Sequence, residues 1–453
     1  MRPSRARVAP IIDDAPLIDD APDSAPGNDL VVRGTARAAL RHREFRVVWL
    51  GQLGSSMGSW MQTFTIGVFI DKLTHQGAWV GIVMFAQMVP MLVFTVPGGI
   101  IADRFERRRL LITLQSLQMA FAAGLGALAL INKDPSKAAV IALVFAGGVC
   151  QSMNAPAYSA VLPALVGRAD MAGAISLNSA AINLSRVVGP VLAGVLYPVL
   201  GAGWLYIINA VTFLFVIAAL ARIRLPALAT TKAEGFAQLA VGFRVVRADP
   251  VLRRVLATMT LFSFFCLPFI SLWSTVARVH VGLSSARAIG TLYAVFGVGA
   301  LLGSLAVGSV LTRFDRRLVS QVGLAGFAAM IGVVALARHN LVLAYPAFFV
   351  LGACYFATTT SLLTVLQSRL ADSVRGRVMA LWFMSFGGTV SLCGPVFGPL
   401  LDHTSGALVL GLGALCAAVL AWWCNLGRVE RTGRTSSKPW YDRRVSTTMG
   451  ERR

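Results

Sequence analysis

The densest group of charged side chains in the sequence lies in the run DRFERRR, from Asp103 to Arg109, between two long apolar runs. Six of its seven residues are charged. Arginines beside an apolar run are typical of a signal that fixes the orientation of a membrane span, which accounts for the basic residues here. Acidic residues contribute little to such a signal. Asp103 therefore needs a different explanation.

A single arginine, Arg186, lies inside an apolar segment, 14 residues from the start of that segment at about Ala172. At about 1.5 Å per helical residue it is roughly 20 Å from that end. A cation at such a depth in a membrane costs several kcal/mol unless it faces a cavity or a partner. Two interpretations stay open: Arg186 contacts a ligand, or it is a structural residue bonded to carbonyl groups and to neighbours such as Asn183.

The acidic residues narrow the choice of ligand. All twenty Asp and Glu residues lie outside the apolar segments or at their ends. No carboxylate in the middle of a segment is therefore available to pair with Arg186 or to carry a proton. This pattern favours an anionic or neutral ligand, and it leaves Asp71 and Asp402, at segment ends, as the available proton sites.

Polar and aromatic side chains within the apolar segments form a further candidate set. Each amide could hydrogen-bond a ligand or bridge two helices, and together they could line a polar path through the first half of the chain. The amides are Gln52, Gln62, Gln87, Gln151, Asn154, Asn178, Asn183 and Asn209. The second half adds Thr358, Thr359, Thr360 and Ser361, with Phe264, Phe265, Trp273 and Trp382, whose rings could stack on a flat ligand or face lipid.

Motifs of enzyme chemistry are absent or out of context. The run GSSMG from Gly54 fits the hydrolase pattern G-x-S-x-G, but it lies in an apolar segment with no strand before it, so a close helix contact explains it better. No Walker A sequence is present. The six cysteines lack CxxC spacing and the five histidines are scattered. We expect no metal, no cofactor and no enzymatic activity.

The composition indicates a membrane protein. Of the 453 residues, 56% are hydrophobic and 13% are charged, and the mean hydropathy is +0.70. Soluble domains are far less apolar. Runs of about 20 mostly apolar residues, long enough to cross roughly 30 Å of hydrocarbon, recur along the chain. The first 40 residues are rich in Pro, Asp and Ala, and we expect them to be disordered.

The apolar segments predict an all-α membrane protein with twelve transmembrane helices in two groups of six. The expected spans are about 46–70, 78–102, 110–131, 138–162, 172–197 and 201–221, then 255–279, 288–311, 318–337, 341–368, 378–401 and 406–427. The domains are then a tail at 1–40, a six-helix bundle at 41–221, a linker at 222–254, a second bundle at 255–427 and a tail at 428–453. The linker includes a possible amphipathic helix at about 236–246.

The basic residues predict the orientation of these helices. Of the 41 Lys and Arg residues, 34 lie in the two terminal segments and in the loops on the same side of the membrane. By the positive-inside rule both termini are then cytoplasmic. The net charge of +21 is explained by this topology and by attraction to anionic lipid, so no nucleic-acid partner is indicated.

The charged run near Asp103 has a second copy 209 residues later. Gly99, Arg104, Phe105, Arg107 and Arg108 recur as Gly308, Arg313, Phe314, Arg316 and Arg317. A second pair of similar segments is VVGPVLAGVL, from Val187, and LCGPVFGPLL, from Leu392. The two groups of six helices are therefore expected to be parallel repeats, an arrangement in which a ligand path runs between two halves that rock against each other.

The chain resembles the major facilitator superfamily. Gly99, Asp103, Arg104, Arg107 and Arg108 meet its signature G-x-x-x-D-[RK]-x-x-[RK]-[RK]. The longer run from Trp60 to Leu111 resembles the bacterial branch that contains the enterobactin exporter and related small-molecule efflux proteins. The sequence departs from the common pattern at Glu106, where many members have Gly, and at Thr312, which replaces the aspartate in the second copy.

The resemblance implies roles for two groups of residues. The charged residues of both copies would form a conformational latch, in which Asp103 meets the start of the eleventh helix near Arg377–Ala380, with Arg375 and Arg377 as cationic partners. Gly189, Pro190 and Gly194 resemble a motif that bends the fifth helix, although a simple packing kink explains them equally well.

The function implied is export of a small amphiphilic molecule, siderophore-like or otherwise anionic or neutral, across the bacterial inner membrane by alternating access. We expect a monomer, with the substrate, protons and membrane lipids as its partners. The substrate and coupling candidates are Arg186, Asn183, Asn154, Gln151, Asn178, Gln62 and Gln87. Two alternatives are a broad efflux transporter of lipophilic drugs and a membrane sensor or scaffold that does not transport.

Overall fold

The computed structural model describes residues 34–167, 169–223, 235–370 and 372–424. Within these ranges every regular element is a helix, and no strand occurs. The expected all-α class is therefore confirmed. Of the expected tails, residues 1–33 and 428–453 lie outside the described residues, as do residues 224–234 of the expected linker. The last residues of the expected amino-terminal tail are described and include a helical turn at Ala36–Ala39, so the expected disorder does not extend to them.

The first group of helices covers the chain as far as Arg222. Its members are α1 (Ala36–Ala39), α2 (Arg43–Thr74), α3 (Gly77–Arg104), α4 (Arg107–Ile131), α5 (Lys137–Val166) and α6 (Met171–Arg222). The 52-residue α6 contains a break at Gly201, where φ is 76° and ψ is 172°. Glycine adopts a positive φ without steric strain, so the chain can reverse there. The spans expected on either side of Gly201 are thus two separate helices.

A short helix, α7 (Gly235–Ala248), precedes the second group and occupies the position of the expected amphipathic helix. The second group comprises α8 (Pro250–Leu261), η1 (Phe262–Cys266), α9 (Pro268–Ser271), α10 (Trp273–Val279), α11 (Ala286–Gly308), η2 (Val310–Arg313), α12 (Arg316–Leu336), α13 (Leu341–Ser368), α14 (Asp372–Phe383), η3 (Met384–Gly388), α15 (Thr389–His403) and α16 (Gly406–Trp423).

Two spans expected to be continuous helices are interrupted. The span at 255–279 breaks into four pieces around Leu267 and Leu272, and Pro268 begins the third piece. Proline cannot donate a backbone hydrogen bond and clashes with the preceding turn, so the helix cannot continue unchanged through it. The span at 378–401 contains the π-helical turn η3, which ends at Gly387 and Gly388. Such turns insert an extra residue into the helix and redirect its side chains.

Nine helical segments in the described residues are long and apolar enough to cross a membrane. One of them, α6, comprises two helices because of its break. The helix α2 is less apolar because it carries Gln52, Gln62 and several serines, and the pieces α8–α10 are each too short alone. With these two included, the helices are consistent with the twelve expected spans.

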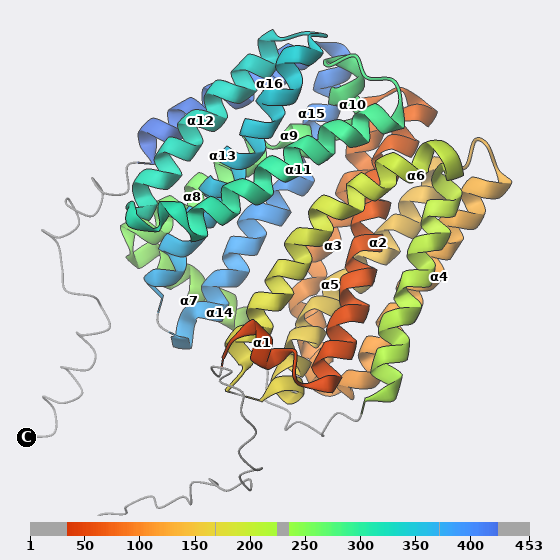
Figure 1. Cartoon of the computed structure of the whole chain (residues 1–453), viewed down its shortest axis with the longest axis vertical. Helices are drawn as coiled ribbons and strands as arrows, with labels where there is room; N and C mark the ends of the chain where they lie inside the picture. Colours follow the sequence, from red (N-terminus) through yellow and green to blue (C-terminus); the bar gives the residue numbers. More distant parts are fainter. Residues whose placement is uncertain (1–33, 168, 224–234, 371, 425–453) are drawn as a thin grey trace, which may run out of the picture.

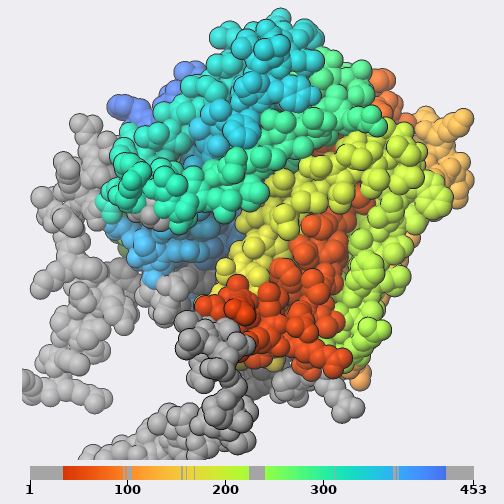
Figure 2. Space-filling model, in the orientation of Figure 1, coloured from red at the N-terminus to blue at the C-terminus, as the bar shows by residue number. Residues whose placement is uncertain are grey.

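The helices form two groups that lie against each other (Figure 1). Helices α2–α6 pack together in one group, and α8–α16 pack together in the other. Contact between the groups is made chiefly by α6 with α11 and by α3 with α15, and Figure 2 shows α6 lying directly along α11. We call the end where α2 begins, next to α1, the amino-terminal face, and the other end the opposite face.

Pairs of glycines let the two groups touch near the opposite face. A Cβ atom added to Gly194 in α6 would lie 2.6 Å from the Cα of Gly290 in α11. Gly81 of α3 and Gly394 of α15 meet in the same way. Small residues of this kind allow membrane helices to approach closely, where dispersion contacts replace the hydrophobic effect. The backbones of the two groups are thus in direct contact at this end.

Substituting Gly81 by alanine should destabilise this contact. The new methyl group would overlap the backbone of Gly394, and overpacking of this kind costs roughly 1–3 kcal/mol. Thermal unfolding of the purified protein in detergent measures the effect. Gly147→Ala in α5 is the matched control, because no atom lies within 4 Å of the position of its added Cβ. Alanine also favours helices, so the control should be neutral or stabilising. Equal melting temperatures for the two variants would contradict the packing argument.

Candidate functional site

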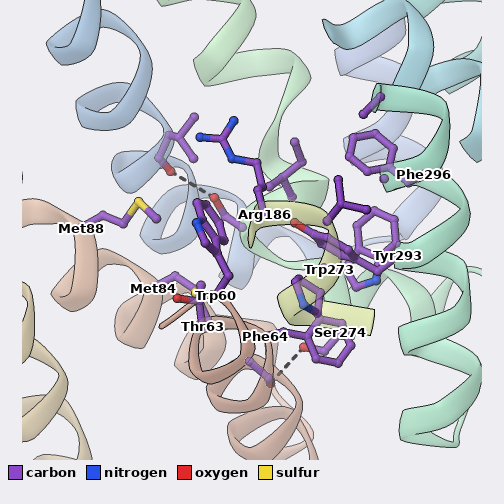
Figure 3. A pocket seen from close by; sticks show the side chains of 18 of the residues that line it. Trp60, Thr63, Phe64, Met84, Met88, Arg186, Trp273, Ser274, Tyr293 and Phe296 are labelled. Atoms are coloured by element: carbon purple, nitrogen blue, oxygen red, sulfur yellow. Dashed lines mark hydrogen bonds between the residues drawn. The ribbon is translucent and has the colours of Figure 1, made fainter. Parts of the chain in front are cut away.

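An open cavity lies between the two groups of helices, with walls from α2, α3, α6, α9, α10, α11, α13 and the region of η3 (Figure 3). Its empty space, together with the solvent at its mouth, is about 1090 Å³. Aromatic rings dominate its lining: Trp60, Phe64, Trp273, Tyr293, Phe296, Tyr355, Phe356 and Phe386. Hydroxyl groups of Thr63, Ser271, Ser274 and Ser391 are the main neutral polar groups. Ligand sites are commonly apolar concave spaces with a few polar groups, and this cavity fits that description.

Arg186 is the one charged residue in the lining of this cavity among the residues that the structure describes. Its guanidinium carbon lies 5.0 Å from the ring centroid of Trp60, 5.8 Å from that of Phe356 and 5.9 Å from that of Phe386. These distances allow cation–π attraction. The Nε atom is buried and has no hydrogen-bond partner in the described part of the chain. Arg186 thus faces a cavity without a described counter-charge.

If Arg186 were a structural residue, we would expect its side chain to hydrogen-bond Asn183. The structure places Asn183 elsewhere: its side-chain amide is exposed and donates to the carbonyl of Ser179, one turn earlier in the same helix. Asn183 is also not among the residues that line the cavity. The partners of Arg186 are the aromatic rings of three other helical segments.

Close packing at Gly189 determines which ring lies beside Arg186. A Cβ atom on Gly189 would lie 2.7 Å from the Cβ of Trp60 and 2.8 Å from the carbonyl oxygen of Met57, so only glycine permits α6 to approach α2 this closely. Pro190 lines the cavity. The dihedral angles of α6 leave the helical region at Gly201 rather than at Gly189 or Pro190. Gly189 therefore brings the ring of Trp60 close to Arg186, and Gly194 contacts α11.

Four of the eight expected amides of the first half bridge two helices. Three hydrogen bonds show this: Asn209 to Gln62 at 2.7 Å, Gln87 to the hydroxyl of Thr63 at 2.9 Å, and Gln115 to Asn154 at 3.2 Å. Each bond joins two different helices. An amide in an apolar environment is costly without a partner, and a neighbouring helix supplies one.

The polar path expected from these amides is therefore not formed around the described cavity. None of the seven substrate and coupling candidates except Arg186 is in its lining. Gln151 is exposed and Asn178 is half-buried, both away from the cavity. Thr63, which sequence reasoning did not single out, does line it, and Gln87 acts on the cavity only through the hydroxyl group of Thr63.

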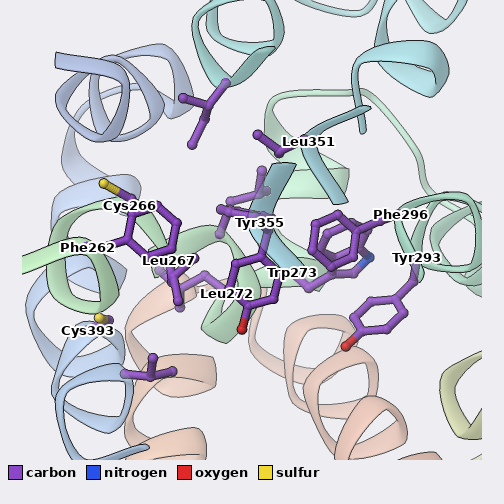
Figure 4. Close-up of a cluster of buried hydrophobic side chains, with 14 of the residues drawn as sticks. Phe262, Cys266, Leu267, Leu272, Trp273, Tyr293, Phe296, Leu351, Tyr355 and Cys393 are labelled. Carbon is purple, nitrogen blue, oxygen red and sulfur yellow. The ribbon is translucent and has the colours of Figure 1, made fainter. Parts of the chain in front are cut away.

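Of the aromatic residues expected in the second half, Trp273 lines the cavity. Its ring packs against Tyr293 at 4.8 Å, Phe348 at 5.2 Å and Phe296 at 5.6 Å between centroids, and Figure 4 shows it within this cluster. Its indole nitrogen donates to the carbonyl of Ile289 at 3.3 Å. The ring is therefore held in place from several sides, which gives the cavity a firm aromatic wall.

The other expected residues of the second half lie outside this wall. Phe264 and Phe265 pack against Phe397, Trp382 is buried elsewhere, and the residues from Thr358 to Ser361 are absent from the lining. Sequence reasoning missed Tyr293, Phe296, Tyr355 and Phe356. The spacing of Tyr293 and Phe296, three residues apart on one helical face, was a usable signal for them.

The repeated basic motif binds the ends of helices. Arg108 donates from Nε to the carbonyl of Leu220 at 2.8 Å and from Nη2 to that of Ala221 at 2.6 Å, at the C-terminal end of α6. In the second copy, Arg316 donates to the carbonyl of Val307 near the end of α11. The last carbonyls of a helix lack partners within the helix and carry partial negative charge, so a guanidinium group stabilises them.

The structure describes the side chains of some of the remaining latch residues and only the backbone of others. Arg107 and Arg317 are half-buried, and Arg313 is exposed, with its guanidinium carbon 5.5 Å from the ring centroid of Phe314. Of Gly99, Asp103 and Arg104 the structure describes the backbone within α3, and the side chains of the latter two lie outside the described part. The expected meeting of Asp103 with the eleventh helix near Arg377–Ala380 therefore stays a prediction, and the structure places those residues inside α14, which already begins at Asp372.

The sequence of the chain is similar to a known family and to characterised exporters. The family model described as transmembrane secretion effector matches residues 34–453. The chain belongs to this family of the major facilitator superfamily. The enterobactin exporter EntS of Salmonella typhimurium is 26% identical over 391 residues, which cover 83% of this chain and 87% of that protein. The EntS protein of Shigella boydii is 27% identical over 386 residues, with the same coverage of each chain.

Solved structures with low sequence identity share the fold of this transporter. The nucleoside transporter NupG gives a TM-score of 0.69 at 12% identity, covering 84% of this chain and 98% of that one. A bacterial homologue of the iron transporter ferroportin, in its inward-facing state, gives 0.66 at 14% identity with the same coverage. The major facilitator fold is thus confirmed, and the family places the protein among membrane transporters of small molecules rather than among enzymes.

Removing the guanidinium group of Arg108 should loosen the end of α6. Arg108→Ala leaves the carbonyls of Leu220 and Ala221 without these donors, at a cost of about 1 kcal/mol, which is expected to lower the melting temperature of the transporter in detergent by a few degrees. The neighbouring Arg109→Ala is the control, because that side chain is 85% exposed and its ion pair within the described residues is with Glu106, three residues away on the surface. A change in melting temperature no larger than that of the control would show that these bonds contribute nothing.

Proposed function

We propose that this transporter exports a small amphiphilic molecule that carries an anionic group, such as a siderophore-like metabolite, across the bacterial inner membrane. The observation that carries the proposal is the position of Arg186. Its guanidinium group faces an otherwise apolar and aromatic cavity between the two groups of helices, and no carboxylate lines that cavity in the described residues.

The chemistry of the lining supports an amphiphilic substrate. A guanidinium group in a low-dielectric site binds carboxylate, phenolate or phosphate oxygens through charge-assisted hydrogen bonds. The surrounding rings offer apolar surface to the remainder of the molecule. Because the rings of Trp60 and Phe356 come from different groups of helices, a bound substrate would contact both groups at once.

The proposed mechanism is alternating access driven by protons. The bundles at 41–221 and 255–427 would rock about the cavity and expose it to one side of the membrane at a time. Both termini would be cytoplasmic, because 34 of the 41 basic residues are expected in the terminal segments and in the loops on the same side of the membrane. The enterobactin exporters are 26–27% identical to this chain over most of its length, which supports the outward direction of transport.

Uptake into everted membrane vesicles tests this function. We expect the wild type to accumulate an anionic siderophore when a pH gradient is present and to stop when an ionophore collapses it. Arg186→Ala should lower uptake at least about tenfold, since one lost charge-assisted contact in an apolar site is worth about 1.5–3 kcal/mol. Arg186→Lys should keep part of the activity because it keeps the charge.

Arg287→Ala provides the matched control for this experiment. Arg287 lies in the first turn of α11 near the opposite face, outside the cavity lining, so its loss should leave uptake unchanged. If an anionic substrate moved equally well in the wild type and in Arg186→Ala, at equal amounts of protein in the membrane, Arg186 would not be its binding group.

The aromatic lining favours a second candidate function, broad efflux of lipophilic drugs. Apolar surface without many fixed hydrogen bonds admits ligands of different shapes. The same vesicles distinguish the two functions, because neutral or cationic drugs would not depend on Arg186. Equal drug uptake by the wild type and Arg186→Ala, with no uptake of anions, would favour this second function. A protein that moves neither class would fit a sensor or scaffold.

A further inference from the structure

Asp71, at the end of α2, is the only buried acidic residue among the side chains that the structure describes, with 3% of its side chain exposed. The side-chain partners that the structure describes for it come from α10 in the other group of helices. Arg278 donates from Nε at 2.8 Å and from Nη2 at 2.9 Å, and the hydroxyl of Thr275 donates at 2.8 Å. Three donors satisfy an ionised carboxylate, which accepts hydrogen bonds only.

A second acidic residue also joins the two groups, but here the second group supplies the carboxylate and the first group supplies the donors. Asp402, near the end of α15, accepts hydrogen bonds from the backbone amides of Gly77 at 2.6 Å and Ala78 at 2.8 Å. These amides open α3, so the carboxylate caps a helix N-terminus, where the dipole favours a negative charge. Each group therefore supplies one carboxylate to the other at the opposite face.

This polar contact lies one helical turn beyond the cavity. Gly67 and Ser274 line the cavity, and the hydroxyl of Ser274 donates to the carbonyl of Gly67 at 3.0 Å. Four residues further along the same two helices are Asp71 and Arg278. Residues four apart lie on the same helical face, so the ion pair continues the cavity wall directly toward the opposite face.

We propose that Asp71 with Arg278, and Asp402 with the N-terminus of α3, form a two-part lock that holds the opposite face shut. The proposal rests on the proposed alternating access, because only a protein that opens at this face must release the lock. Sequence reasoning considered both acidic residues as proton sites, whereas the structure engages both in contacts between the groups.

The two parts of the lock differ in strength. The pair of Asp71 and Arg278 is bidentate and mostly removed from solvent, so removing one partner leaves a poorly solvated charge. Asp402 is exposed, and its contact with the amides of α3 is weakened by water and salt. Asp71→Asn should therefore open the opposite face more than Asp402→Asn, and the double variant should open it most.

Distance measurements between spin labels test the lock directly. Labels at Val199→Cys in the first group and Val342→Cys in the second lie at exposed positions toward the opposite face, 74% and 82% exposed, and are introduced after the native cysteines have been replaced. We expect one short distance in the parent protein. Asp71→Asn should increase the fraction of a longer distance by about tenfold, in the range typical of coupling between two conformations.

Matched controls separate the lock from a general loss of charge or of folding. Asp134→Asn removes an exposed acid from the same face that makes no described contact between the groups, and it should leave the distances unchanged. Arg278→Gln should reproduce Asp71→Asn, and the two changes together should add little, because they break the same bond. Asp402→Asn alters an exposed side chain and serves if Asp71→Asn fails to give a folded, monodisperse protein.

The outcome does not depend on finding the substrate. If the short distance persists in Asp71→Asn, Arg278→Gln and Asp402→Asn alike, the lock is wrong, even when Arg186 proves to bind an exported anion. If the longer distance appears in these variants while no substrate is transported, the lock stands and the proposed export function fails.

Discussion

A guanidinium group in the apolar centre of a membrane protein is the constraint on which the rest of this structure depends. A cation at that depth costs several kcal/mol unless its surroundings compensate for lost hydration. Around Arg186 the described side chains offer the rings of Trp60, Phe356 and Phe386. Cation–π attraction to each ring stabilises the charged group by about 0.5–2 kcal/mol. Three rings together contribute about 1.5–6 kcal/mol, which is comparable to the cost, but they do not supply the hydrogen-bond acceptor that the buried Nε lacks in the described part of the chain. An anionic ligand, as proposed above, would supply that acceptor.

The surroundings of Arg186 depend in turn on how closely the helices pack. Gly189 lets α6 approach α2 and brings Trp60 to the guanidinium group, while Gly194 lets the same helix touch Gly290 of α11. Helix α6 is thus held by glycine contacts on two sides, at the boundary between the groups. Because the rings near Arg186 come from both groups, any change in their relative position alters the environment of its charge. A ligand that binds one arrangement better shifts the balance between arrangements.

Much of this architecture could be predicted from the sequence, because hydrocarbon length and positive charge restrict membrane helices to few arrangements. The depth of Arg186 followed from its distance along an apolar segment. Other features depended on contacts between distant segments. Gln62 and Asn209 are 147 residues apart, and nothing in either segment alone shows that their amides meet. The break of the seventh span near Leu267 was likewise hidden, because a proline in a membrane helix is compatible with a mild kink as well as with a break.

The break of the seventh span has a physical consequence for the cavity. It leaves α10 as a rigid piece of only seven residues, bounded by the non-helical residue Leu272. One side of this piece meets the cavity through Trp273 and Ser274, and the next turn carries Arg278, which binds Asp71. In a long straight helix, a displacement at the cavity would have to move a whole span. In α10, a ligand that displaces Trp273 acts on the same seven-residue helix that carries Arg278 of the proposed lock, so the cavity and the lock are coupled through one short rigid element.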